Sequence, residues 1–279
     1  MKRTLLFVGI PCLVVAAAWT TFHEAKVLDS KADVMKVLST FGCRIVDNSI
    51  DERSSTTARS SMKEYYFKIE GEGDAFAISN ETHGNFSIST NREWDKIRGV
   101  GRTGAKKWAN ENAARQYVLS KLQQIAGNQP GSIVQFKYAL DSPNSRGKVV
   151  LGILEALFQF KFNGHPTVDR YCGYIVKLDP QDGKLLSFRS GPRPPEIGGA
   201  GTPSSEASAR ARAEAVHPRA NIASMRARLG WAVPPGGGNA VLTYVLQNSN
   251  SITAGSEAIL VEVKQNGRVW DTGPSPGTL

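Results

Sequence analysis

The residues best suited to acid–base chemistry in this sequence are His165, Asp169 and Arg170. An imidazole with a carboxylate close by can transfer protons near neutral pH, as in many hydrolytic sites. His165 stands directly before Pro166 in a turn sequence, however, and a histidine in that position is usually an exposed loop residue. His83 lies beside a turn glycine and has the same interpretation. We therefore expect neither histidine to be catalytic.

Nucleophilic and metal-binding patterns are also weak. No serine lies in a nucleophile-elbow sequence, and neither Cys43 nor Cys172 has a context typical of a catalytic thiol. The four histidines have no metal-ligand spacing among themselves or with the cysteines. Asp179 and Asp182 could chelate a cation, but aspartates so placed more often stabilise a hairpin turn by bonding to its backbone. We expect no catalytic residue, no metal and no cofactor, and hence a protein that is not an enzyme.

A glycine-rich segment, Gly99-Val100-Gly101-Arg102-Thr103-Gly104, matches the G-x-G-x-x-G pattern of dinucleotide-binding proteins. That function needs a buried strand before the glycines and an acidic residue about twenty positions beyond them. Residues 94–98 are largely polar, and residues 123–128 contain no carboxylate. We interpret the segment as a connector that precedes a helix.

Residues 1–25 have the plan of a secretory signal or N-terminal membrane anchor. Lys2 and Arg3 precede an uncharged stretch from Thr4 to Phe22, and Ala16-Ala17-Ala18 supplies the small residues that a signal peptidase requires. Cleavage after Ala18 would lower the net charge by two, from +9 to +7. The uncharged stretch is also long enough to remain in a bilayer as an anchor. Either alternative predicts a secreted, periplasmic or cell-envelope protein.

Outside the cytoplasm, Cys43 and Cys172 could either form a disulfide or remain as two free thiols. A disulfide between them would close a long loop and stabilise the fold. A sequence does not show whether two Cα atoms come close enough for such a bond. Two buried thiols are equally compatible with this sequence, so both alternatives stay open.

The protein is basic, with a pI near 9.5, but its lysines and arginines are dispersed. We expect no nucleic acid among its partners, because no run of basic residues of that type occurs. The alternating alanines and arginines at residues 210–212 and 226–228 are interpreted as solvated helix faces. An anionic surface of the cell envelope stays among the partners to consider.

Three helices are predicted from apolar residues at helical spacing and from capping residues, at 26–41, 105–125 and 202–216. Strands follow each helix, and each group of strands contains a hairpin in which an apolar strand reaches a turn glycine and a short apolar strand follows. The three hairpins are residues 75–88, 174–188 and 259–270. This order predicts an α+β fold of tandem modules, each with one helix packed on a small antiparallel sheet.

The first and most divergent module is placed at residues 26–98, the second at 105–190 and the third at 204–272. Residues 191–203 are so rich in proline and glycine that we interpret them as a linker. Residues 273–279 form a tail.

The second module carries a family resemblance. Its motifs are Glu111-Asn112-Ala113-Ala114-Arg115, Phe160-Lys161-Phe162-Asn163-Gly164-His165-Pro166 and Val176-Lys177-Leu178-Asp179-Pro180-Gln181-Asp182-Gly183-Lys184-Leu185-Leu186-Ser187-Phe188. In this order they resemble the PepSY superfamily, particularly tandem extracytoplasmic proteins of the YcdB/YcdC-repeat type. Ser205-Glu206-Ala207 in the third module is similar, although Val263 stands where the family favours Asp. The resemblance implies cystatin-like α+β modules without catalytic residues, which bind or restrain proteins such as proteases.

Phe158, Phe160 and Phe162 alternate along one predicted strand and therefore share a face. They belong to the core if that face is covered, and they form a peptide- or protein-binding face if it is open. We expect an extracytoplasmic binding protein with a protein partner, a protease being the class that the resemblance suggests. The alternatives are a structural or adhesive envelope protein that contacts anionic groups, and an unrecognised hydrolase.

Overall fold

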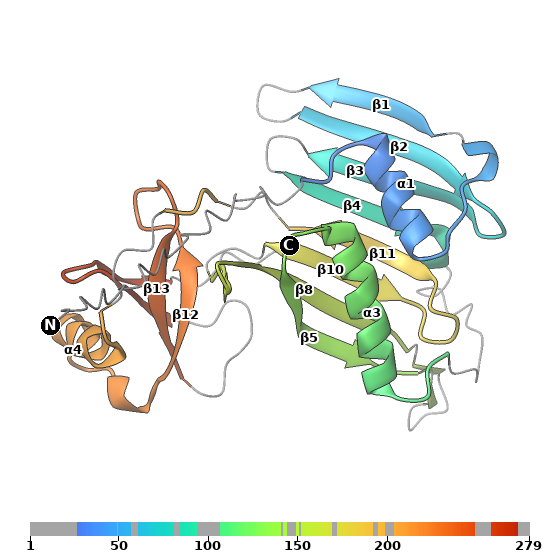
Figure 1. Cartoon of the computed structure of the whole chain (residues 1–279). Coiled ribbons are helices and arrows are strands. Elements are labelled where there is room, and N and C mark those ends of the chain that lie inside the picture. Colours follow the sequence, from blue (N-terminus) through green and yellow to red (C-terminus); the bar gives the residue numbers. More distant parts are fainter. Residues whose placement is uncertain are drawn as a thin grey trace, which may run out of the picture.

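The computed structural model describes residues 27–48, 50–56, 61–80, 84–93, 107–140, 142–143, 149–150, 152–168, 172–191, 195–198, 204–248 and 258–272. The chain forms three consecutive segments, and in each of them a helix is followed by four longer antiparallel strands (Figure 1). The fold is therefore α+β with antiparallel sheets, as the sequence predicts.

The first segment contains α1 (Lys31–Thr40), the short helix η1 (Val46–Asn48), β1 (Asp51–Thr56), β2 (Ser61–Ile69), β3 (Gly73–Asn80) and β4 (Asn85–Thr90). The second contains α3 (Glu111–Ala126), β5 (Gly131–Tyr138), β6 (Ser142–Pro143), β7 (Val149–Val150), β8 (Leu154–Phe162), β9 (His165–Pro166), β10 (Gly173–Leu178) and β11 (Leu185–Ser190). The third contains α4 (Glu206–Val216), the short helix η2 (Ile222–Ser224), β12 (Arg226–Ala232), β13 (Val241–Gln247), β14 (Ala258–Glu262) and β15 (Val269–Thr272).

A polar residue caps the start of each of α1, α3 and α4. At α1 the Ser30 hydroxyl accepts from the backbone N–H of Asp33 at 3.3 Å, and the Asp33 carboxylate accepts from the N–H of Ser30 at 3.2 Å. This reciprocal pair is a capping box. Asn110 caps α3, and Ser205 caps α4. The helices start four to six residues after the predicted positions because these caps fix where the helical backbone begins.

All three predicted hairpins are present. β3–β4 turns at Gly84 and β10–β11 turns at Gly183, with φ angles of 66° and 73° that favour glycine. In β14–β15 the left-handed residue is Asn266, with a φ of 67°. Gly267 has a different role there, because a Cβ at this position would lie 2.7 Å from the Cβ of Glu262.

The first two segments share one sheet. β4 pairs antiparallel with β11 along a contact that we call the seam, and the strand order is β1-β2-β3-β4-β11-β10-β8-β5, with β9 beside β8 as the ninth strand. The expectation of a separate small sheet under each helix is therefore wrong for these segments. The reason is apolar burial across the seam, where the buried rings of Phe86 and Phe188 meet edge to face with their centroids 6.3 Å apart. Separate sheets would expose both rings to water.

Both α1 and α3 lie on the same face of the nine-stranded sheet (Figure 1). Lys36 of α1 donates from Nζ to the carbonyl of Ile125 in α3 at 2.8 Å. The main core forms beneath these helices from alternate strand residues such as Tyr65, Phe158 and Val176. Neither α1 nor α3 lies on the opposite face, which we call the helix-free face because it lacks these two helices. The helical residues 91–93 reach this face at the seam, where Glu93 accepts from Ser187.

The third segment forms its own four-stranded sheet, in the order β12-β13-β14-β15, and α4 packs on it. Trp231 of β12 attaches this sheet to the second segment, because its indole Nε1 donates to the carbonyl of Phe162 at 2.7 Å. Part of the predicted linker, residues 195–198, is described, and Ile197 pairs there with Ala240 just before β13. These linker residues lie against the third sheet.

Among the residues that the structure describes, no helix is long and apolar enough to cross a membrane. The predicted signal or anchor at residues 1–25 and the tail at residues 273–279 lie outside the described residues.

Candidate functional site

The helix-free face carries apolar side chains that are only partly covered. Strand alternation places Tyr66, Phe76 and Ile78 on this face in the first segment, and Leu157 and Ile175 in the second. Cross-strand pairing sets Tyr66 opposite Phe76 and Ile175 opposite Leu157. Tyr66 is 40 % exposed. The face therefore has an apolar group on each side of the seam.

A polar strip separates these two apolar groups. Along the seam, Ser89 of β4 lies opposite Ser187 of β11. The hydroxyl of Ser187 donates to Glu93 Oε1 at 3.1 Å, and Lys177 Nζ lies 3.8 Å from the same oxygen. A molecule that covered the helix-free face would thus meet apolar surface on both sides of a polar centre.

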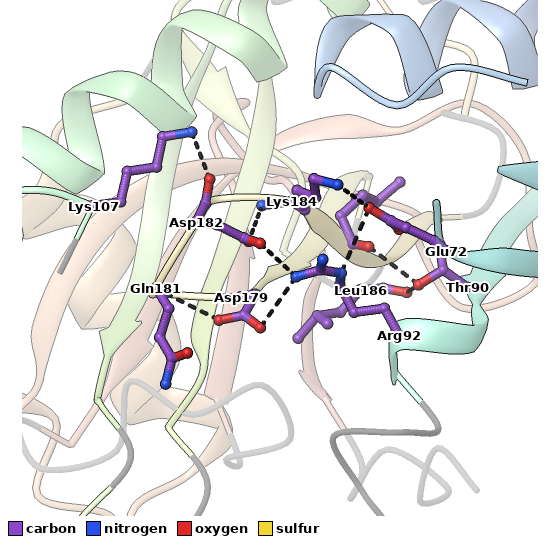
Figure 2. A network of polar contacts seen from close by, with 10 residues as sticks. Glu72, Thr90, Arg92, Lys107, Asp179, Gln181, Asp182, Lys184 and Leu186 are labelled. Atoms are coloured by element: carbon purple, nitrogen blue, oxygen red, sulfur yellow. Dashed lines mark hydrogen bonds and ion pairs between the residues drawn. The ribbon is translucent and has the colours of Figure 1, made fainter. Parts of the chain in front are cut away.

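A cluster of charges lies at one end of the seam (Figure 2). Arg92 comes two residues after β4, and its guanidinium lies 2.6 Å from Asp182, 3.5 Å from Asp179 and 3.6 Å from Glu72. Lys184 Nζ lies 2.8 Å from Glu72. Glu72 and Arg92 belong to the first segment, whereas the other three belong to the β10–β11 hairpin. The cluster therefore joins the two segments by ion pairs.

This charge cluster is shielded from water. The side chains of Glu72 and Arg92 are only 3 % and 13 % exposed. Burial strengthens such ion pairs and makes the loss of a partner costly. Among the described residues neither Glu72 oxygen has a hydrogen bond of good angle. Since Lys184 nevertheless approaches to 2.8 Å, the Glu72 carboxylate is held by charge attraction rather than by aligned hydrogen bonds.

Hydrogen bonds to backbone carbonyls reinforce the seam beside the cluster. Thr90 at the end of β4 donates from its hydroxyl to the carbonyls of Leu185 and Leu186, at 3.1 and 3.0 Å. Lys107 donates from Nζ to the carbonyl of Asp182 at 2.7 Å (Figure 2). Residues from both segments thus fix the β10–β11 turn in place.

Asp179 and Asp182 also build their own turn. Asp179 Oδ1 accepts from the N–H of Gln181 and Asp182 Oδ1 accepts from the N–H of Lys184, each at 3.0 Å. This is the turn-stabilising use that the sequence favours over cation chelation. Within the described part of the chain, no group of three or more His, Cys, Asp and Glu side chains has an arrangement that could hold a metal ion.

Cys43 follows α1 and lies near the same cluster. Burial, and after it the charge of Glu72, raises the pKa of the Cys43 thiol to about 11. The thiol therefore stays protonated at neutral pH, where only the thiolate is nucleophilic. Cys43 also lines a hollow of about 490 Å³ together with Met35, Leu38 and Ile45. Cys172 is buried as well, and the two cysteines do not form a disulfide.

The predicted aromatic binding face is part of the core. Phe158, Phe160 and Phe162 are all buried. Phe158 stacks on Tyr174 with ring centroids 6.0 Å apart, and Phe160 meets the same ring edge to face at 5.0 Å. The three phenylalanines do share one face, but that is the face beneath α3, so they are not available as a binding surface.

Two other predicted groups have different outcomes. His165 lies on β9, where it is half-buried and pairs with Phe162. Asp169, Arg170, His83 and the segment Gly99–Gly104 lie outside the described residues.

The arginines of α4 contact backbone groups. Arg212 donates to three carbonyls at the β14–β15 hairpin, the closest being that of Lys264 at 2.8 Å. Arg210 donates to the carbonyl of Ile222 at 2.7 Å. The interpretation as a solvated helix face is wrong for both residues, and residues 226–228 lie on strand β12. No local pattern could reveal these contacts, because the acceptors are carbonyls up to 55 residues away.

Comparison with protein-family models finds no match for this chain, and comparisons with curated proteins and with solved structures find none either.

Proposed function

We propose that this chain is an extracytoplasmic binding protein without chemistry of its own, and that a protein partner docks on its helix-free face. The observation that carries the proposal is that α1 and α3 both lie on one face of the nine-stranded sheet and leave apolar side chains of the other face partly accessible. The open face of such a sheet is ordinarily polar. Here it keeps five large apolar side chains partly accessible, and such surfaces are typical of protein-binding sites.

The proposal includes the nature of the repeats. Three segments each contain an α-helix and four longer antiparallel strands, and each ends in the hairpin on which the PepSY resemblance rests. We propose that these are PepSY-like repeats, of which two have merged their sheets. A protease is the class of partner that the resemblance favours.

The seam supports binding by making the face rigid. The two apolar groups of the face lie on different segments, so a partner that spans both needs them in a fixed relation. The buried charges around Arg92 and the hydroxyl of Thr90 hold the segments together. A preformed surface loses less conformational entropy on binding, which raises affinity.

Site-specific photo-crosslinking in envelope extract tests this proposal. A photoreactive amino acid at Tyr66 or Ile175, on the helix-free face, is expected to capture the same protein in stoichiometric amount at moderate salt. The same amino acid at Met35, an exposed apolar residue of α1 on the opposite face, is expected not to capture it. Capture that disappears with added salt would instead support contact with anionic envelope groups. Hydrolytic turnover that is lost in a His165→Ala variant would contradict the proposal.

A further inference from the structure

The seam has the symmetry of a two-fold contact between repeats. The first and second segments meet through the last strands of their sheets, β4 and β11, which pair antiparallel over four residue pairs. On either side of this pair the order of strands is the same: last, third, second and first long strand of each segment. Two repeats thus make one continuous sheet by joining equivalent edges.

The third segment keeps the equivalent edge without a neighbouring strand among the described residues. Its last strand, β15, pairs with β14 and ends the sheet. The contact with the second segment is made by β12 at the other end of the sheet, through Trp231. The edge of β15 is therefore at the end of the third sheet opposite to the strand that contacts the second segment.

We propose that β15 pairs antiparallel with β15 of a second copy of this chain, which reproduces at the third repeat the joining of the first two. The resulting sheet would have eight strands in the same symmetric order as the path through the seam. Pairing of two copies through β1, the end strand of the larger sheet, would double the eight-strand path of that sheet. The resulting sheet would exceed the roughly ten strands that an open twisted sheet ordinarily reaches. The short sheet of the third segment has no such restriction.

Side-chain chemistry selects the register of this pairing. A two-fold axis at Trp270 sets the two Trp270 rings opposite each other, and Val269 of each copy opposite Asp271 of the other. An axis at Asp271 would set two carboxylates opposite each other, which destabilises a sheet. Trp270 is half-buried against Leu260 and Val245, so part of its ring is left for a cross-strand aromatic pair. His217 Nε2 lies 3.4 Å from the Oδ1 of Asp271.

Cysteine crosslinking tests the contact and its register together. Directly opposed residues bring two Cα atoms to about 5 Å, within disulfide range, whereas residues displaced by two positions lie beyond about 7 Å. Under mild oxidation the Trp270→Cys variant is expected to form a covalent dimer, and the Asp271→Cys variant and the wild-type protein are expected to stay monomeric on a non-reducing gel. A dimer of Asp271→Cys without one of Trp270→Cys would overturn the proposed pairing.

Sedimentation of the full wild-type chain provides a readout that needs no variant. We expect its mass to rise from one chain towards two between micromolar and submillimolar concentration, as for a weak dimer. Trp270→Asp, which places two carboxylates at the axis, is expected to weaken this dimer about tenfold or more, whereas Met35→Asp on α1 should leave it unchanged. A wild-type protein that sediments as a single chain throughout that range would contradict the inference.

Discussion

Replacement of Arg92 by methionine is the most informative test of how the two segments are joined. Methionine preserves much of the apolar stem but leaves Glu72, Asp179 and Asp182 without the guanidinium that they share. Lys184 would remain beside Glu72. Removing one member of a buried ion pair costs about 3–5 kcal/mol. Because Asp182 is partly exposed, we expect a loss near the lower end, about 3 kcal/mol in the free energy of unfolding.

Arg44→Met is the matched control. Arg44 also pairs with a glutamate, Glu70 at 3.8 Å, but its side chain is 84 % exposed. Exposed pairs contribute less than about 1 kcal/mol. The assay is urea unfolding followed by tryptophan fluorescence and far-UV circular dichroism at neutral pH. Equal free energies of unfolding for Arg92→Met and Arg44→Met would refute the view that buried charges lock the seam.

Three further predictions concern single residues. Trp231→Phe removes the donor to the Phe162 carbonyl, so the unfolding free energy should fall by about 1–3 kcal/mol; an unchanged urea midpoint would count against this attachment of the third segment. Burial raises the pKa of Glu262, but bonds from the Arg268 backbone and from Lys264 outweigh it and leave this pKa below its usual value. Glu262 therefore stabilises the fold above the unfolded glutamate pKa of about 4.3, and this stabilisation is lost as pH falls through the lower folded pKa. In Glu262→Gln the free energy of unfolding in urea should change less with pH in the acidic range. A pH dependence parallel to that of the wild type would disprove this role of Glu262. The Cys43 thiol, with its pKa raised to about 11, stabilises the fold below the unfolded cysteine pKa of about 8.5, and this stabilisation is lost as pH rises towards 11. Cys43→Ala should therefore lose less stability than the wild type at alkaline pH. An equal loss in the variant and the wild type would show that other groups cause the alkaline loss.

The three hairpins and the three helices could be predicted because their signals are local. A turn needs a residue that tolerates positive φ, and Gly84 and Gly183 supply it within the sequence of the hairpin itself. Helix starts depend on a capping side chain three residues away, as at Ser30 and Asp33. Such features need no knowledge of what lies elsewhere in the fold.

Strand β1 and the joining of the two sheets could not be predicted in the same way. β1 reads Asp-Glu-Arg-Ser-Ser-Thr and is exposed along its whole length, so it has no apolar alternation to detect. The residues of β4 and β11 show which strands are apolar, but they do not show that each strand covers the other. The pattern of a sequence predicts which face of a strand is buried, but it does not predict which other strand pairs with it.

The candidate sites illustrate the same distinction. The alternation of Phe158, Phe160 and Phe162 correctly predicts a shared face, but only the packing of α3 shows that this face is core. The proposed binding face lies on the intervening residues, such as Leu157, which are less conspicuous in the sequence. The charge cluster joins Arg92 to Asp182 across 90 positions, and no spacing rule applies at that distance.

The most direct test of the proposed function starts from the partner that crosslinking identifies. This partner is purified without crosslinking, and its affinity for two matched variants of the chain is measured. Tyr66 and Met35 are large apolar residues that are 40 % and 38 % exposed, on opposite faces of the first segment. Removing a central apolar anchor of an interface costs about 2 kcal/mol or more. By titration calorimetry we expect Tyr66→Ser to weaken binding at least about tenfold and Met35→Ser to leave it unchanged. Undiminished affinity in Tyr66→Ser, with a loss in Met35→Ser, would place the partner on the helical face and contradict the proposal.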